Sequence, residues 1–250
     1  MPTNHLSHSQ GGCSQDGSKQ WFTALCLSVI LVLSVGLSGQ ASAAENDPYE
    51  GLNRKIFGFN EFLDKWLLKP VAKGYRWVTP GFVDDGVSNF FDNLGEVSNL
   101  LNGGLQGDFS HAGTSTGRLL VNSTIGLGGL FDVATGWGLE ERKEDFGQTL
   151  AVWGVGDGPY VVLPILGGKS LRDTFARIPD TYTSPVTYLN DVPTRNSLRG
   201  LDLVDTRADL IDAEALVSGD RYSFLRDITA QQREANINNG EVEDDFGDDF

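Results

Sequence analysis

Apolar side chains recur every three or four residues along most of the chain, which is the spacing of one face of an α-helix. In the first such segment the apolar positions are Leu52, Ile56, Phe59, Leu63 and Trp66. Asp47 ahead of Pro48 predicts the N-cap of this helix. Pro70 predicts its end and the start of a short second helix that stops at Thr79 and Pro80.

The same pattern predicts helices in most of the remaining chain. A broad apolar stripe from Val83 to Leu101 predicts a third helix, which we expect to fray at Asn102, Gly103 and Gly104. Asp108 and Ser170 have the residue types of N-caps for two further helices. Later helices are expected at Asn196 to Ile211, around Ala213 to Val217 and from Asp220 to about Asn236, after an irregular connector spaced by Pro179, Pro185 and Pro193. Only 160–163 suggests a strand, and no partner strand is evident, so the sequence predicts an all-α protein.

The stretch from Leu119 to Leu166 is apolar and rich in glycine at the same time. Glycine weakens helices and strands, so this backbone needs support from its surroundings. A charged cluster at 140–145 divides the stretch into two apolar arms, which predicts a hairpin with a hydrated tip. Such a hairpin is typical of a segment in or beside a membrane, while a buried glycine-rich loop in a soluble core is the alternative.

The first 43 residues have the pattern of a secretory signal peptide. No charge occurs from Trp21 to Gly39, and Ala41-Ser42-Ala43 provides a cleavage signature. A retained membrane anchor is the alternative, because the apolar run is near the lower limit for a spanning helix. Cys13 and Cys26 both precede the expected cut, and neither has the surroundings that lipid attachment needs. We therefore predict export without a lipid anchor.

The charge of the chain excludes several kinds of partner. The formal net charge is −15, which argues against nucleic acid and against electrostatic docking onto anionic lipid. Much of this charge lies in 240–250, which we expect to be a disordered acidic tail, with a short docking peptide as the alternative.

Candidate chemistry is sparse. Only His111 among the histidines follows the expected cut, and we expect it to be solvated on its helix. Without cysteine, this leaves no basis for a histidine-rich metal site, and the glycines at 126–129 and 167–168 depart from nucleotide-binding motifs. The sequence therefore predicts no enzyme activity, no metal and no cofactor.

Several segments read together resemble one family. They are NDPYEGLNRKIFGFN, GVSNFFDNLGE, LQGD followed by GRLLVNSTIGLGGLFDVA, FGQTLAVWGVGDGPYVVLP, SLRD and TRADLIDAEALV. In order and spacing they resemble the MlaA/VacJ family of outer-membrane phospholipid-trafficking proteins of Gram-negative bacteria. The resemblance covers about 46–239, so we expect a domain at 44–239 between the signal peptide and the tail.

The resemblance implies an architecture and a function. The fold would be a ring of amphipathic helices lying in the inner leaflet of the outer membrane around a central channel, with a glycine-rich hairpin. Family members are taken to remove phospholipid that has strayed into the outer leaflet and so to maintain lipid asymmetry. The implied partners are phospholipid, a trimeric outer-membrane porin and a periplasmic lipid carrier that serves an inner-membrane ABC transporter. Family members are typically lipoproteins, and the absence of a suitable cysteine is a departure from that pattern.

The resemblance also implies candidate channel and gate residues. They are Gly58, Phe59 and Asn60 near the N-terminus, Gly154, Gly156 and Gly158 in the hairpin, and Arg172 with Asp173 as a charged pair at the passage. Each has an ordinary alternative: Phe59 as core, the glycines as turns and the charged pair as a surface pair. The alternative functions are a soluble periplasmic binding or scaffold protein, or a lipid hydrolase that depends on His111.

Overall fold

The computed structural model describes residues 47–239. The helices are α2 (Glu50–Leu63), α3 (Lys69–Val78), α4 (Gly81–Gln106), α5 (Phe109–Thr124), α6 (Val133–Gly136), α7 (Phe146–Val152), α8 (Leu171–Thr183), α9 (Val192–Ala213) and α10 (Arg221–Ile237). Short 3₁₀ turns lie at Pro185–Tyr188 and Glu214–Leu216. Within the described range the only strands are β1 (Tyr160–Leu163) and β2 (Gly167–Ser170), which confirms the all-α prediction. The expected signal peptide and the whole of the acidic tail lie outside the described residues.

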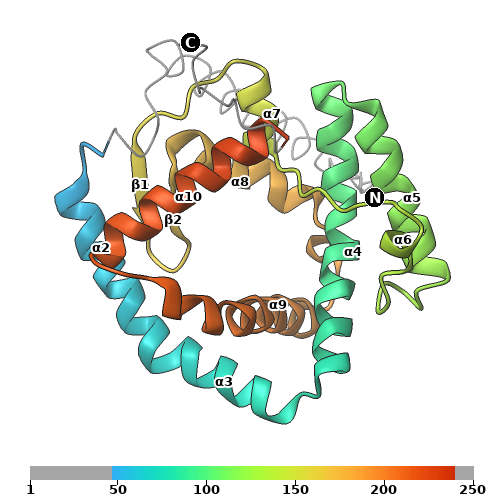
Figure 1. Cartoon of the computed structure of the whole chain (residues 1–250), viewed down its shortest axis with the longest axis horizontal. Coiled ribbons are helices and arrows are strands. Elements are labelled where there is room, and N and C mark those ends of the chain that lie inside the picture. The colour runs from blue at the N-terminus through green and yellow to red at the C-terminus, as the bar shows by residue number, and fades with distance from the viewer. Residues whose placement is uncertain (1–46, 240–250) are drawn as a thin grey trace, which may run out of the picture.

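The helices follow one another around a ring (Figure 1). α2 and α3 form one side, α4 crosses to the other, and α7 with β1 completes the rim, where α4 contacts α7 and α2 contacts β1. α9 packs against α3 and α4, α8 packs against α7, and α10 contacts α7 and β2. α5 packs along α4 and lies with α6 outside the ring.

The first two helices are continuous, which corrects the break expected at Pro70. A π-helical segment at Asp64–Leu68 joins α2 to α3, and Pro70 falls in the first turn of α3. A wider π turn changes which backbone groups pair, so the missing N–H of proline is tolerated without a break. Asp47 is not the N-cap either, because α2 starts at Glu50 and the Asp47 carboxylate accepts a hydrogen bond from Asn53 Nδ2 at 2.8 Å.

The third predicted helix is also longer than expected. α4 passes through Asn102, Gly103 and Gly104 without fraying and ends at Gln106, and the φ of 83° at its C-cap Gly107 suits glycine. A Cβ on Gly103 would lie 2.9 Å from His111 Cδ2 and 3.3 Å from the Ala112 backbone nitrogen. Gly103 therefore permits the close approach of α5 to α4, and this packing stabilises the helix end.

The hairpin predicted for Leu119 to Leu166 is wrong, because this stretch contains the end of α5, α6, α7 and β1, and the hairpin in the structure lies at its end, between β1 and β2. β1 pairs with β2 in antiparallel register, from Tyr160 opposite Ser170 to Leu163 opposite Gly167. The first two residues of β2 are glycines, which are unfavourable in strands, so the sequence does not predict this partner strand. The charged segment 140–145 precedes α7 and is not the hairpin tip, and its Glu144 is buried rather than hydrated.

Other local predictions were closer. Asp108 accepts a hydrogen bond from the His111 backbone N–H, and Ser170 accepts one from that of Asp173, so both predicted caps are confirmed. The proline connector is more helical than expected, because Pro179 lies inside α8 and Pro193 lies in the first turn of α9. A proline in the first turn loses no intrahelical bond, so α9 begins four residues earlier than predicted.

Candidate functional site

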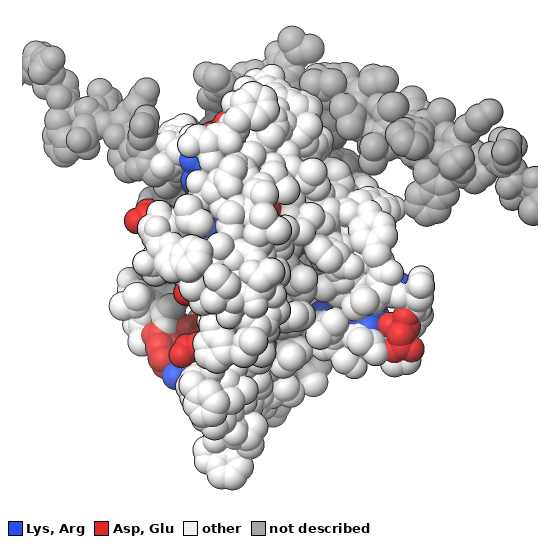
Figure 2. All heavy atoms as spheres, turned by 90° about the vertical axis from the view of Figure 1, so that its right-hand side faces the viewer, with Lys and Arg blue, Asp and Glu red and all other residues white. Residues whose placement is uncertain are grey.

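The outside of the ring exposes large apolar side chains. At the corner between α3 and α4 the exposed fractions are 87% for Trp77 and 77% for Phe82, and Phe109 at the start of α5 is also 77% exposed. The face over α4, α5 and α6 shows few charged atoms in Figure 2. Its exposed apolar residues include Leu120, Ile125, Leu127, Leu130, Phe131 and Trp137. Apolar surfaces of this extent mark contact with a membrane or another protein.

The inside of the structure is polar. The largest fully buried side chains in the described range are Glu96, Asn53, Asn102, Thr149 and Ser115. Buried apolar residues form only small clusters there, such as Leu150, Val155 and Ala176. The usual distribution of apolar and polar side chains is therefore inverted. Buried polar groups are costly unless they are hydrogen-bonded, so these side chains need partners inside the structure.

A buried network around Arg118 satisfies part of this polar interior. Arg118 on α5 forms an ion pair with Glu96 on α4 and donates to Thr135 Oγ1 at 2.8 Å and to the Leu139 carbonyl at 2.6 Å. Asp132, which caps α6, lies 3.3 Å from the same guanidinium group. The network joins α4, α5 and α6, and the sequence does not predict it because the partners of Arg118 are 14 to 22 positions away from it.

Two asparagines on α2 hold the hairpin. Asn53 donates to the Tyr160 carbonyl and accepts from the Val162 N–H, both at 3.0 Å. Asn60, two turns later on the same helix face, donates to the Leu163 carbonyl at 3.0 Å and accepts from the Ile165 N–H at 2.8 Å. The two amides thus bind the free edge of β1 as a neighbouring strand would.

Of the three N-terminal candidate residues, only Asn60 has a hydrogen bond to the hairpin in the described part of the chain. Phe59 is about half exposed on α2, so the alternative that it is core is wrong. A Cβ at Gly58 would meet no heavy atom within 4 Å. Gly58 and Phe59 therefore lie on the open side of α2.

A cavity of about 690 Å³ lies between α7, β2, α8 and α10. Arg172 and Asp173 line it and are both buried, so the alternative that they form a surface pair is wrong. Arg172 Nε lies 3.0 Å from Asp173 Oδ1, and Arg172 Nη1 lies 2.5 Å from Asp157 Oδ1. The Val155 carbonyl accepts a further bond from Nη1 at 3.3 Å.

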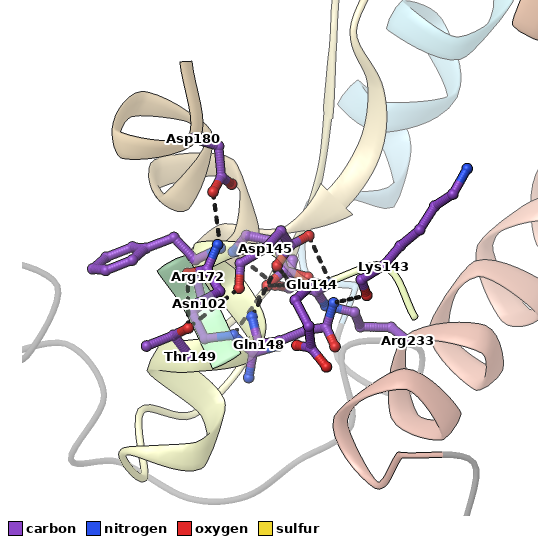
Figure 3. Close-up of polar contacts among 12 residues, drawn as sticks. Asn102, Lys143, Glu144, Asp145, Gln148, Thr149, Arg172, Asp180 and Arg233 are labelled. Carbon is purple, nitrogen blue, oxygen red and sulfur yellow. Dashed lines mark hydrogen bonds and ion pairs between the residues drawn. The ribbon is translucent and has the colours of Figure 1, made fainter. Parts of the chain in front are cut away.

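Arg233 on α10 extends this ion cluster. It donates to both carboxylate oxygens of Asp145, at 2.7 and 2.8 Å (Figure 3), and it also donates to Asp173 Oδ1 at 2.8 Å. Burial acts to raise the pKa of Asp145, but the bonds and charge of Arg233, together with the Gln148 N–H and the charge of Lys169, hold that pKa below its usual value. Gly147 makes the approach possible, because a Cβ there would lie closer than 3.0 Å to both Arg233 Nη2 and Asp173 Oδ1.

The candidate glycines of the loop between α7 and β1 lie beside this cavity. Gly154 and Gly156 line it, whereas Gly58, Phe59 and Asn60 do not. Gly154 has a φ of 87° and Gly158 a φ of 67°, a region that glycine adopts without strain. The structure thus brings Gly154 and Gly156 together with Arg172 and Asp173, but it separates the N-terminal candidates from them.

Two acidic residues near the cavity have raised pKa values. Burial raises the pKa of Asp180 to about 6, although its Oδ1 accepts a hydrogen bond from the Phe146 N–H at 2.9 Å. Burial also raises the pKa of Glu144, whose side chain accepts from Gln106 Nε2 at 2.8 Å. Both groups titrate closer to neutral pH than exposed carboxylates do.

The position of His111 differs from the prediction of a solvated residue. Its side chain is buried, and burial lowers its pKa. Ser115 Oγ lies 3.5 Å from its Nε2, but Asp108 accepts from the backbone N–H of His111 and not from its ring. A catalytic triad needs a carboxylate that orients the imidazole, so these three residues do not have that geometry.

Between residues 47 and 239, no helix combines the length and apolar character that crossing a bilayer requires. The same range contains no group of three or more His, Cys, Asp or Glu side chains placed to hold a metal ion.

These features define a class: a helical ring with an apolar outer surface and a polar, ion-paired interior. A profile of the family described as MlaA lipoprotein matches residues 45–236. The chain therefore belongs to the MlaA family, as its sequence motifs predict.

Individual relatives agree with this assignment. The chain is 34% identical over 229 residues to the intermembrane phospholipid transport system lipoprotein MlaA of Escherichia coli, covering 88% of this chain and 90% of the relative. It is 30% identical over 234 residues to the MlaA of Haemophilus influenzae, covering 90% and 93%. An uncharacterised protein of Rickettsia bellii is 37% identical over 195 residues, covering 76% of each chain.

A solved structure shares the fold. It comes from work described as "Structural basis for maintenance of bacterial outer membrane lipid asymmetry" and superposes with a TM-score of 0.69. Its sequence is 35% identical, and the match covers 76% of this chain and 98% of that one.

Proposed function

We propose that this protein removes mislocalised phospholipid from the outer leaflet of the Gram-negative outer membrane and passes it to a periplasmic lipid carrier. The names of the E. coli and H. influenzae relatives, which refer to intermembrane phospholipid transport, support this function. The shared fold of a structure concerned with lipid asymmetry supports it further.

The inverted distribution of side chains carries the proposal. Trp77, Phe82 and Phe109 are each more than three quarters exposed, whereas Glu96 is fully buried. Covering a large apolar side chain contributes about 1.5–3 kcal/mol, so one leaflet of a bilayer would stabilise a belt of such residues. A soluble periplasmic scaffold protein gains nothing from this belt, which disfavours that alternative.

The polar interior suits the movement of a lipid headgroup. Burying an unpaired charge in hydrocarbon is costly, so a phospholipid crosses a leaflet more easily where polar side chains accompany its head. In this proposal the headgroup passes along the ring interior, and Arg172, Asp173, Gly154, Gly156 and Gly158 border its path. Gly58, Phe59 and Asn60 act at a distance, through the contact of Asn60 with the hairpin.

Transport by this chain would be passive, so partners set its direction. Each CH₂ exposed to water costs about 0.8 kcal/mol, which means that a two-tailed lipid needs a carrier to leave the bilayer. We propose a periplasmic carrier linked to an inner-membrane ABC transporter as acceptor, and a trimeric porin as neighbour in the outer membrane. The protein would reach the periplasmic side of this membrane after cleavage of residues 1–43, and the belt would hold it there without a lipid anchor.

The test is complementation of a Gram-negative strain that lacks its own family member. Surface phospholipid is measured with an amine-reactive dye that does not cross membranes. We expect the full chain to lower surface labelling to the wild-type level, and Trp77→Glu to restore less than the control Gln231→Glu, which changes an exposed residue of α10. Unchanged labelling with the full chain present in the outer membrane would refute the proposal.

The hydrolase alternative makes a separate prediction. It requires His111, the residue that would activate a nucleophile. We expect His111→Asn to keep full complementation if the protein folds, and lysophospholipid to stay at background. Accumulation of lysophospholipid that depends on His111 would support the hydrolase instead.

A further inference from the structure

The charged residues that line the 690 Å³ cavity are mostly paired with each other or with near neighbours. Arg172 pairs with Asp157 and Asp173, and Arg233 pairs with Asp145 and Asp173. Such pairs leave little charge to attract a ligand, because each is already compensated.

Two lining residues are exceptions to this pairing. Lys169 on β2 and Glu234 on α10 have no oppositely charged side-chain partner within 4.0 Å among residues 47–239. Lys169 is half-buried and Glu234 is exposed. The cavity thus offers one free cation and one free anion, from two different walls.

Further donors lie in the same cluster. Nη2 of Arg172 and Nε of Arg233 are buried and have no hydrogen-bond acceptor in the described part of the chain. A buried donor without an acceptor is unfavourable, so an incoming group with several acceptor oxygens would be favoured near these guanidinium groups. A phosphate group has such oxygens.

From these observations we infer that the cavity binds a zwitterionic phospholipid headgroup, with its phosphate at Lys169 and its ammonium group at Glu234. The inference rests on the proposed function and adds to it the place and the headgroup class. The cavity volume lies within the usual range of small-molecule sites, roughly 300–1,000 Å³.

The charge balance favours a zwitterion over an anion. Asp145, Asp157 and Asp173 face the two guanidinium groups, so Lys169 brings this cluster to neutrality. Glu234 then makes the lining slightly negative. The phosphate of either kind of headgroup can pair with Lys169, but only a zwitterion also has an ammonium group for Glu234, whose charge an anionic headgroup leaves unpaired.

The test uses purified full-length protein in a nonionic detergent. The probes are short-chain phosphatidylethanolamine and phosphatidylglycerol, each below its critical micelle concentration, together with inorganic phosphate. Dissociation constants are measured by titration calorimetry for the wild type, Lys169→Gln and Glu234→Gln. Lys73→Gln is the matched control, because Lys73 is exposed on α3, has no ion pair and does not line the cavity.

We expect the wild type to bind phosphatidylethanolamine more tightly than phosphatidylglycerol. Lys169→Gln should weaken both lipids about tenfold, because it removes the charge at the phosphate. Glu234→Gln should weaken only phosphatidylethanolamine, by about fivefold, and Lys73→Gln should change neither. Neither cavity residue has an ion pair to lose, so all variants should keep the thermal unfolding midpoint of the wild type.

Two results would overturn the inference. One is wild-type affinity for both lipids in Lys169→Gln and Glu234→Gln. The other is inorganic phosphate binding as tightly as phosphatidylethanolamine, which would define a general anion site. Either result leaves the proposed function standing if the wild-type chain still lowers surface phospholipid in cells, whereas failure of that complementation refutes the proposed function itself.

Discussion

Replacing Gly147 with alanine should break the contact that fastens α10 to α7. A Cβ at this position would lie closer than 3.0 Å to Arg233 Nη2 and Asp173 Oδ1, and 3.1 Å from Asp145 Oδ1. Three members of one ion cluster therefore surround a space that only glycine leaves open. The added methyl group forces Arg233 or Asp173 to move.

The size of the effect follows from two opposing contributions. Breaking a buried ion pair costs about 3–5 kcal/mol, because a charge loses its partner without gaining water. Alanine gains up to about 1 kcal/mol over glycine in a helix. The expected net loss for Gly147→Ala is about 2–4 kcal/mol, which corresponds to a drop of roughly 4–16 °C in unfolding midpoint for a chain of this size.

The control substitution is Gly113→Ala. Gly113 lies within α5, is exposed, and has no heavy atom within 4 Å of an added Cβ. It gains helix propensity without a clash, so its midpoint should stay unchanged or rise slightly. Tryptophan fluorescence during heating in detergent measures both variants, and hydrogen exchange of α10 locates the effect.

The reasoning would be refuted if Gly147→Ala were as stable as Gly113→Ala and α10 kept its protection from exchange. That result would mean that Arg233 does not approach the backbone of α7 as described. A loss of α10 protection with an unchanged midpoint would show that the side chain swings away at low cost, and would contradict the magnitude given above.

Three other predictions concern separate parts of the fold. The pKa of Asp180 is raised to about 6, so the folded state binds this proton more tightly than the unfolded state, and the contribution of Asp180 to stability falls as pH rises from about 4 to 6. Asp180→Asn should remove this loss of stability. Equal pH profiles of unfolding for Asp180→Asn and the wild type would contradict the prediction. Arg118→Lys keeps the charge but loses the planar guanidinium group that binds Glu96 and the Leu139 carbonyl. It should lower the free energy of unfolding, measured with a chemical denaturant, by about 2–4 kcal/mol. A loss below about 1 kcal/mol would refute the role of the network. Asn60→Ala removes the hydrogen bond to the Ile165 N–H, so the hydrogen of this amide should exchange at least tenfold faster, while the thermal unfolding midpoint of the whole chain changes little. An unchanged exchange rate would contradict the anchoring of the hairpin to α2 by Asn60.

The sequence predicts those parts of the fold that depend on near neighbours. The caps Asp108 and Ser170 are confirmed because each contacts a backbone N–H three residues later. The continuity of α4 through Gly103 depends on α5, and strand β2 depends on β1, so local pattern fails at both places.

The candidate site, too, is predictable from the sequence only where its residues are close neighbours along the chain. Arg172 and Asp173 are adjacent in the sequence and interact in the structure, whereas Arg233, the third partner, is 60 positions from Asp173. Periodicity gives each helix a polar face and an apolar face, but it does not say which face is buried. On α2 it predicts an apolar face, and only tertiary contacts, such as that of Asn53 with β1, show that the buried residue of this helix is polar.

The central claim is that the apolar outside of the ring lies within one leaflet of a bilayer. Fluorescence quenching by lipids brominated near the headgroup tests it in single-tryptophan variants that keep Trp77 or Trp137, with a variant that carries only Gln231→Trp as control. The account predicts strong quenching of Trp77 and Trp137, which lie on different sides of the ring, and weak quenching at position 231. Folded protein in which neither native tryptophan is quenched above the control would contradict the claim.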